Sequence, residues 1–428
     1  MNKAAVASGT AWTPLATLVA KLVFPLVGLY VTRTLGPDIN GQFALLTQLV
    51  GLADVIRDGG LTQTYLVEKA PTEADERQYN AAALLTGLVP ALLILDATRW
   101  APAFFGAPFL SYALPFTALA VACQTLTTMP NARLLRAGRF RESAILNLSV
   151  GAGSLFLCVL LVRMGAGVNA LLTQLVTGPV VGAIALRLLV PSYGYAFARG
   201  PIVARLRRSG ILIVTNLVNN VFIMSDVFVI QRALGGPFTG YYNYAQNIGY
   251  KPAEAIVFPL SRTLMVAFSQ DAGNLPRLRS AYGRAIAATI ALVLPIFAFM
   301  AVHAEAIVLT LGGPAFLGAA PVLRILSIYL GFRALGNISG NTLVPLGHHK
   351  WTLIPWIAAL AVTGFGVATV LREPAVADHL RGWGPFGVTD VMGLRVEADG
   401  PRADALSRIV WWYVAGAATA YGWIVALA

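Results

Sequence analysis

Apolar stretches long enough to cross a membrane follow one another along most of this chain. A bilayer core about 30 Å thick is crossed by about 20 apolar residues in a helix, because each backbone N–H and C=O must be hydrogen-bonded within the segment. The pattern predicts an all-α polytopic membrane protein with about twelve transmembrane helices. Their approximate ranges are 9–31, 41–63, 80–98, 110–132, 144–162, 167–190, 210–231, 241–267, 284–302, 320–345, 351–371 and 409–428.

Composition agrees with lipid as part of the solvent. Hydrophobic residues make up 57% of the chain and charged residues 12%, against about a quarter charged in ordinary soluble domains. No large soluble domain interrupts the apolar pattern, so we expect a transporter without catalytic residues rather than a membrane-attached enzyme. The net charge of +12 does not predict nucleic-acid binding, because most of it lies in short loops between the spans.

Basic loop residues predict the orientation, since Lys and Arg accumulate in short loops on the cytoplasmic side. They gather between spans four and five, six and seven, and eight and nine. These residues are Arg133, Arg136, Arg139, Arg141, Arg199, Arg205, Arg207, Arg208, Arg277 and Arg279. Both termini are therefore predicted to be cytoplasmic, in a bacterial cytoplasmic (inner) membrane. Residues 373–408 are too polar for a clean span, so they are either irregular or contain a degenerate span at Gly382–Gly393, and the topology of the last helix stays open.

An internal repeat predicts two bundles. TRTLGPDINGQF at 32–43 and QRALGGPFTGYY at 231–242 share Arg-x-Leu-Gly, four residues, a glycine, one residue and an aromatic. The copies join spans one and two and spans seven and eight, on the same predicted side of the membrane. Two parallel six-helix repeats have this arrangement. The predicted organisation is an N-terminal bundle over 1–195, a basic cytoplasmic linker over 196–209 and a C-terminal bundle over 210–428.

Charged residues inside the spans are candidate functional residues, because an ionisable side chain at mid-span costs about 2.5–3.5 kcal/mol unless it meets water or a partner. Lys21, Arg262 and Arg333 have no carboxylate within one turn of their own helices, so a carboxylate of another helix, a lipid headgroup or an anionic ligand must supply the counter-charge. Other charged residues inside the spans can pair with a neighbour on their own helix, which explains their presence equally well. Asp54, Arg57 and Asp58 share one helical face, and Lys251 can pair with Glu254 across Pro252.

Amides and tyrosines cluster in the same spans. They suit the hydroxyls of a sugar in a cavity, and hydrogen bonds between helices are the alternative. The residues singled out are Asn216, Asn220, Tyr244, Asn247, Asn337 and Asn341. The two cysteines lie in apolar stretches and the four histidines lack ligand spacing, so neither a disulfide nor a metal site is predicted.

Three stretches, 31–69, 225–261 and 305–350, resemble polysaccharide exporters. These are the Wzx-type lipid-linked oligosaccharide flippases of the multidrug/oligosaccharidyl-lipid/polysaccharide exporter superfamily. The resemblance covers 1–372 and fades afterwards. It implies two six-helix bundles around a cationic central cavity. Alternating access in such a protein moves a polyprenyl diphosphate-linked oligosaccharide, the repeat unit of O-antigen (lipopolysaccharide), capsule or exopolysaccharide, across the membrane.

The resemblance also implies roles by position. Lys21, Arg262 and Arg333, with Lys251, are candidates to neutralise the diphosphate. The coupling-ion candidates are Asp54, Asp58, Asp226 and Glu254, for H⁺ or Na⁺, and no other cofactor is expected. Membrane lipids and a glycan polymerase or export machinery are the expected partners.

Two other function classes stay open. A cation-coupled small-molecule antiporter of the same superfamily would favour acidic over basic cavity charges. A polytopic glycan polymerase or ligase would be an enzyme, and proteins similar to these enzymes carry catalytic Arg or His in a sizeable outer loop. The only long loop predicted here is 373–408.

Overall fold

The computed structural model describes most of the chain. The described residues are 3–58, 61–68, 71–190, 194–197, 217, 220–221, 224–257, 260, 264, 268, 274–343, 353–372 and 401–427. They form two compact units. Unit 1 comprises Met1–Leu35 and Gln42–Met224, and unit 2 comprises Gly36–Gly41 and Ser225–Ala428.

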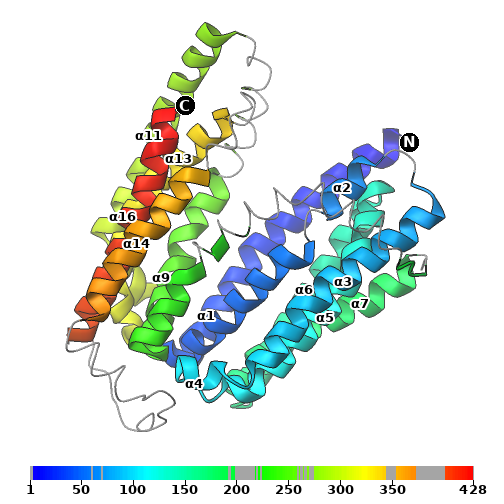
Figure 1. The fold of residues 1–428 in the computed structure, drawn as a ribbon, viewed down its shortest axis with the longest axis horizontal. Helices are drawn as coiled ribbons and strands as arrows, with labels where there is room; N and C mark the ends of the chain where they lie inside the picture. The colour runs from blue at the N-terminus through cyan, green and yellow to red at the C-terminus, as the bar shows by residue number, and fades with distance from the viewer. Residues whose placement is uncertain are drawn as a thin grey trace. The chain divides into compact units, whose positions relative to one another are not determined.

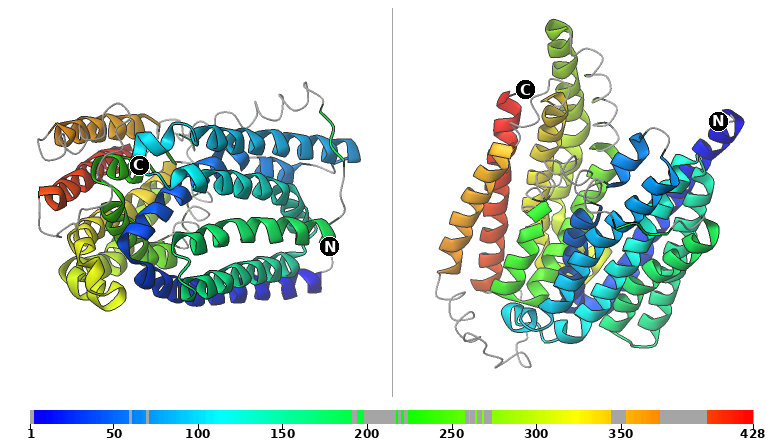
Figure 2. Two further views of the ribbon diagram at one scale, coloured as in Figure 1. Left: turned by 90° about the horizontal axis from the view of Figure 1, so that it is seen from below. Right: turned by 45° about the vertical axis from the view of Figure 1, so that its right-hand side comes forward.

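Unit 1 is a bundle of long helices. Within it α5 packs against α3 and α7, α6 packs against α7, and these helices run side by side in both figures (Figure 1, Figure 2). A capping box at Thr72 and Asp75 begins α3, which explains where the helix starts. The elements of the bundle are α1 (Lys3–Asp58), α2 (Leu61–Val67), α3 (Glu73–Ala97), α4 (Ala101–Phe105), α5 (Leu110–Arg136), α6 (Phe140–Arg163) and α7 (Val168–Leu189).

Unit 2 is a second bundle, centred on α13. This helix packs against α9, α11 and α16, and α16 packs against α14 (Figure 1). Residues 224–234 are helical at its start. The other elements are α9 (Gly236–Pro252), the π-helix η1 (Ala253–Val257), α11 (Leu275–Val302), α12 (Ala304–Gly312), the 3₁₀-helix η2 (Pro314–Ala319), α13 (Ala320–Leu343), α14 (Leu353–Leu371) and α16 (Pro401–Leu427).

The outer faces of these helices are apolar. Leu92 and Leu93 of α3 and Phe156 of α6 are 60–72% exposed, as expected of side chains that face lipid. By length and composition, seven helices in the described part of the chain are long and apolar enough to cross a membrane. The structure confirms an all-α polytopic membrane protein. The count of twelve spans stays a prediction.

Several boundaries differ from the sequence prediction. The element α1 comprises two helices that meet at Gly36, where the backbone is not helical, so the predicted turn between the first two spans is present. Residues 401–408 are helical rather than irregular, because α16 begins at Pro401, and proline suits the first turn of a helix. Arg133 and Arg136 belong to the last turns of α5 rather than to a loop. The predicted 1–195 and 210–428 bundles remain a prediction, and residues 198–209 of the predicted linker lie outside the described residues.

The glycine turns of the two repeat copies, Gly36–Gly41 and residues 235–240, pack against each other inside unit 2. Gly36 (φ 78°, ψ 173°) and Gly235 (φ 93°, ψ −177°) have the same backbone conformation, which side chains disfavour. Five residues later, an added Cβ at Gly41 would lie 1.9 Å from the carbonyl oxygen of Gly236. A Cβ at Gly240 would likewise lie 1.8 Å from the carbonyl oxygen of Pro37. Glycine is therefore required because backbone meets backbone.

A third copy of this turn was not predicted from the sequence. Gly313 has φ 79° and ψ −177°, and Gly318 follows it by five residues, as in the first two copies. A Cβ at Gly318 would lie 2.7 Å from the ring of Tyr241, so this turn also packs on α9. Three similar turns thus meet around the start of α9.

We expect Gly240→Ala to lower the free energy of unfolding by about 1–3 kcal/mol, because the new methyl group overlaps the Pro37 carbonyl oxygen. The thermal unfolding of the purified protein in detergent measures this change. Gly283→Ala in α11 is the matched control, since its Cβ meets nothing within 4 Å. Equal melting temperatures for the two variants would contradict the backbone contact.

Candidate functional site

A buried carboxylate lies in the apolar interior of unit 2. Asp226 is 5% exposed and lies in the helix 224–234. One carboxylate oxygen accepts the Val227 backbone N–H at 2.6 Å, and the other accepts a hydrogen bond from the Tyr242 hydroxyl of α9. Tyr242 is in position to do this because it follows Gly240, whose contact with Pro37 fixes the start of α9.

An arginine lies close to this carboxylate. Arg333 of α13 donates hydrogen bonds to the hydroxyl groups of Tyr250 and Tyr329, the second at 3.3 Å. Its guanidinium carbon also lies 4.9 Å from the centre of the Tyr250 ring, which is the geometry of a cation–π contact. The sequence shows no carboxylate within one helical turn of Arg333. The partner that α13 supplies within one turn is instead the neutral phenol of Tyr329.

These side chains form one polar cluster. Asp226 interacts electrostatically with both Arg333 and Tyr413, and the Tyr413 hydroxyl donates to Ser225 at 3.1 Å. We call this set the Asp226–Arg333 cluster. Its members are Ser225, Asp226, Tyr242, Tyr250, Tyr329, Arg333 and Tyr413. A guanidinium and several phenols can bind an anionic group and the hydroxyls of a sugar.

The Lys251–Glu254 pair predicted from the sequence is present. The ammonium and carboxylate groups lie 3.0 Å apart, and both side chains are about half exposed. The pair spans the change from α9, which ends at Pro252, to the π-helix η1. Pro252 lacks a backbone N–H, which explains why the α-helical hydrogen bonds end there.

The acidic residues of α1 also have local partners. Arg57 pairs with Asp54 at 3.1 Å, as the spacing predicts, and donates to the Gln124 carbonyl oxygen of α5 at 3.2 Å. Asp58 accepts the Thr62 hydroxyl at 2.6 Å. These contacts tie α1 to α5 and α2, and any role in ion coupling stays a prediction.

The other candidates predicted from the sequence are not members of the Asp226–Arg333 cluster. Tyr244 is buried and packs on Phe316 of η2 with ring centres 4.4 Å apart. Asn247 is exposed and donates to the carbonyl oxygen of Asn243 at 2.9 Å, and Asn220 lies in a helical segment. Other candidates lie outside the part that the structure describes: Arg262 and Asn216 entirely, and Lys21, Asn337 and Asn341 in their side chains. Within the described residues, no group of acidic, histidine or cysteine side chains fits a metal.

Sequence reasoning missed a buried polar network at one end of unit 1. Arg133 of α5 pairs with Glu76 of α3 at 2.8 Å and donates to the Asn80 side chain at 2.6 Å. The side chains of Arg133 and Glu76 are only 9% and 10% exposed. The hydroxyl of Tyr65 donates to Glu76, and burial together with this hydrogen bond raises the pKa of Tyr65. The partners are 57 positions apart in the sequence, which explains why helical spacing did not reveal the pair.

We expect Arg133→Ala to lower the free energy of unfolding by about 3–5 kcal/mol, because it leaves the buried Glu76 carboxylate without its counter-charge. Arg77→Ala removes the pair with Glu73, whose side chains are 53% and 75% exposed, and should cost at most about 1 kcal/mol. Thermal unfolding in detergent measures the loss of stability of both variants. The double variant Glu76→Leu/Arg133→Met should recover most of the loss, and failure to do so would contradict the assignment to the ion pair.

Comparisons with known proteins agree with this architecture. The family model described as polysaccharide biosynthesis protein matches residues 30–321, more than half of the chain. The succinoglycan biosynthesis transport protein ExoT of Rhizobium meliloti (strain 1021) is 24% identical over 400 residues, which cover 92% of this chain and 75% of that protein.

Two solved structures share the fold. The lipid II flippase MurJ in an inward closed conformation superposes with a TM-score of 0.71 at 11% identity, covering 97% of this chain and 87% of MurJ. An inward-facing multidrug resistance MATE family transporter gives a TM-score of 0.63 at 14% identity, covering 95% and 93%. The fold is the one that the MurJ flippase and the MATE transporter share, and the chain is a multi-pass membrane protein that belongs to the polysaccharide biosynthesis protein family.

Proposed function

We propose that this chain translocates a polyprenyl diphosphate-linked oligosaccharide from the cytoplasmic to the outer leaflet of the cytoplasmic membrane by alternating access. The observation that carries the proposal is the Asp226–Arg333 cluster. An arginine is well suited to a diphosphate, because its planar fork binds phosphate oxygens in pairs. Tyrosine rings supply both an apolar face and a hydroxyl, which suits a sugar ring.

The names of similar proteins support this substrate class. One relative is named a succinoglycan biosynthesis transport protein and one structural neighbour a lipid II flippase. The first name favours an exopolysaccharide repeat unit over O-antigen or capsule. A glycan polymerase or export machinery would then be the partner that takes up the translocated unit.

Two alternative functions predict different results when the chain is deleted. A small-molecule antiporter would leave the pool of lipid-linked oligosaccharide unchanged when the chain is deleted. A polymerase or ligase would leave unpolymerised units on the outer leaflet. The proposed flippase instead predicts that a deletion strain accumulates lipid-linked oligosaccharide on the inner leaflet.

Arg333→Gln should reduce export of the glycan at least about tenfold while the protein stays in the membrane, because it removes the charge offered to the diphosphate. Surface polysaccharide and protein amount, measured in a complemented deletion strain, test this. Arg324→Gln is the matched control, since Arg324 lies on the same helix in an exposed pair with Glu305. Normal export by Arg333→Gln would remove the anion-binding role of the cluster.

Asp226→Asn should abolish the dependence of translocation on an H⁺ or Na⁺ gradient, because the amide oxygen can still accept the Tyr242 hydroxyl but the charge is lost. Purified protein in vesicles with a defined lipid-linked oligosaccharide and an imposed gradient measures this. Asp404→Asn, at an exposed position of α16, is the control. If Asp226→Asn retains full gradient dependence, Asp54, Asp58 and Glu254 remain as the coupling candidates.

A further inference from the structure

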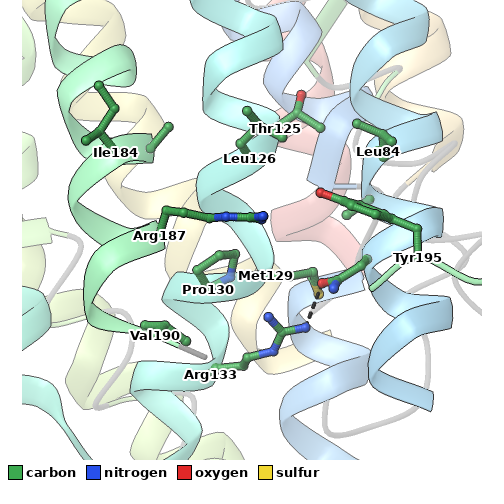
Figure 3. Close-up of a pocket in the computed structure, with 13 residues that line it drawn as sticks. Leu84, Thr125, Leu126, Met129, Pro130, Arg133, Ile184, Arg187, Val190 and Tyr195 are labelled. Carbon is green, nitrogen blue, oxygen red and sulfur yellow. Dashed lines mark hydrogen bonds between the residues drawn. The ribbon is translucent and has the colours of Figure 1, made fainter. Parts of the chain in front are cut away.

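Unit 1 contains a pocket that the transport proposal does not use. Its volume is about 310 Å³, near the lower end of the range for small-ligand sites. Helix α5 forms its floor, α3 and α7 form its two walls, and Tyr195 lies at its rim (Figure 3). Thr125, Leu126, Met129 and Pro130 supply the floor.

The pocket is apolar at one end and cationic at the other. Leu84, Leu126 and Ile184 lie at the end nearer the middle of the helices (Figure 3). Arg133 and Arg187 lie within the last turn of α5 and of α7, which is about 3–5 Å from the helix ends. These ends carry the basic loops that are predicted to be cytoplasmic. The cationic end is therefore at the depth of lipid headgroups.

Among the described residues, one positive charge of the pocket has no ion-pair partner. Glu76 neutralises Arg133, and Asn80 is occupied by Arg133 and by the carbonyl oxygen of Gly194 at 3.2 Å. None of the ion pairs between described residues includes Arg187. The Arg187 guanidinium points into the pocket, toward the Tyr195 hydroxyl (Figure 3).

The rim of the pocket is held in place by backbone contacts. The Ala196 N–H donates to the Arg77 carbonyl oxygen of α3 at 3.0 Å, and Asn80 holds the neighbouring Gly194 carbonyl. Tyr195 stands between these two anchors. These anchors hold the backbone on both sides of Tyr195, so its hydroxyl and the Arg187 guanidinium are donors at one end of an apolar slot.

We propose that this pocket binds one anionic phospholipid, with its phosphodiester at Arg187 and Tyr195 and the upper part of an acyl chain against Leu126 and Ile184. Basic pockets between transmembrane helices near the cytoplasmic surface bind lipid headgroups by the same chemistry. A single net positive charge matches a headgroup with one negative charge better than a diphosphate with more. The bound lipid would fill the groove between α3 and α7.

Native mass spectrometry of the full-length protein in detergent, titrated with phosphatidylglycerol, tests the proposal. One phosphatidylglycerol should bind more tightly than phosphatidylcholine with the same acyl chains. Arg187→Gln should weaken that binding by about tenfold, because one charge-assisted contact is lost. Arg77→Gln is the matched control, since Arg77 lies at the same end of unit 1 outside the pocket lining, and it should bind as the wild type does.

A second variant keeps the test valid if Arg187→Gln folds poorly. Ala183→Leu fills the apolar end of the pocket, and it should weaken binding while the melting temperature without lipid stays unchanged. Equal binding of the two phospholipids, or unchanged binding by Arg187→Gln, would overturn the proposal. So would displacement of the lipid by inorganic phosphate at the same concentration, or preferred binding of a polyprenyl phosphate.

Discussion

Unit 2 depends on a contact in which one backbone lies directly on another. Gly41 and Gly240 each occupy a place where a single methyl group would overlap a carbonyl oxygen of the opposite turn. This contact fixes where α9 begins, and the tyrosines that follow Gly240 are placed by it. Tyr242 then meets Asp226, and Tyr244 packs on Phe316. The position of the polar cluster is therefore set by glycines that carry no functional group.

The sequence predicts features that repeat or that depend on local spacing. The Gly36 and Gly235 turns were found because their copies share an arginine, a leucine, two glycines and an aromatic, and the Lys251–Glu254 pair follows from helical geometry. The third turn, at Gly313, was missed because it lacks the arginine, the leucine and the late aromatic of the other copies. Of the residues that define the repeat, it keeps the two glycines that the backbone requires, five residues apart.

Contacts between helices that are distant in the sequence could not be predicted from the sequence alone. Arg133 was assigned to a loop by its charge, yet it lies in α5 and pairs with a carboxylate of α3. Arg333 was singled out as an arginine inside a predicted span, but its tyrosine partner Tyr250 depends on how α9 packs against α13. Spacing along one helix predicts neighbours on that helix only, and Tyr329 is the neighbour that it identifies.

The π-helix after Pro252 has a mechanical consequence. A π-turn holds one more residue than an α-turn, and one residue corresponds to a rotation of about 100° around the helix axis. Conversion of Ala253–Val257 to α-helix would turn the chain beyond Val257 relative to α9, whose start is held by the contact between Gly240 and Pro37. A register change of one residue can thus reorient the segment that follows the π-helix without unfolding a helix.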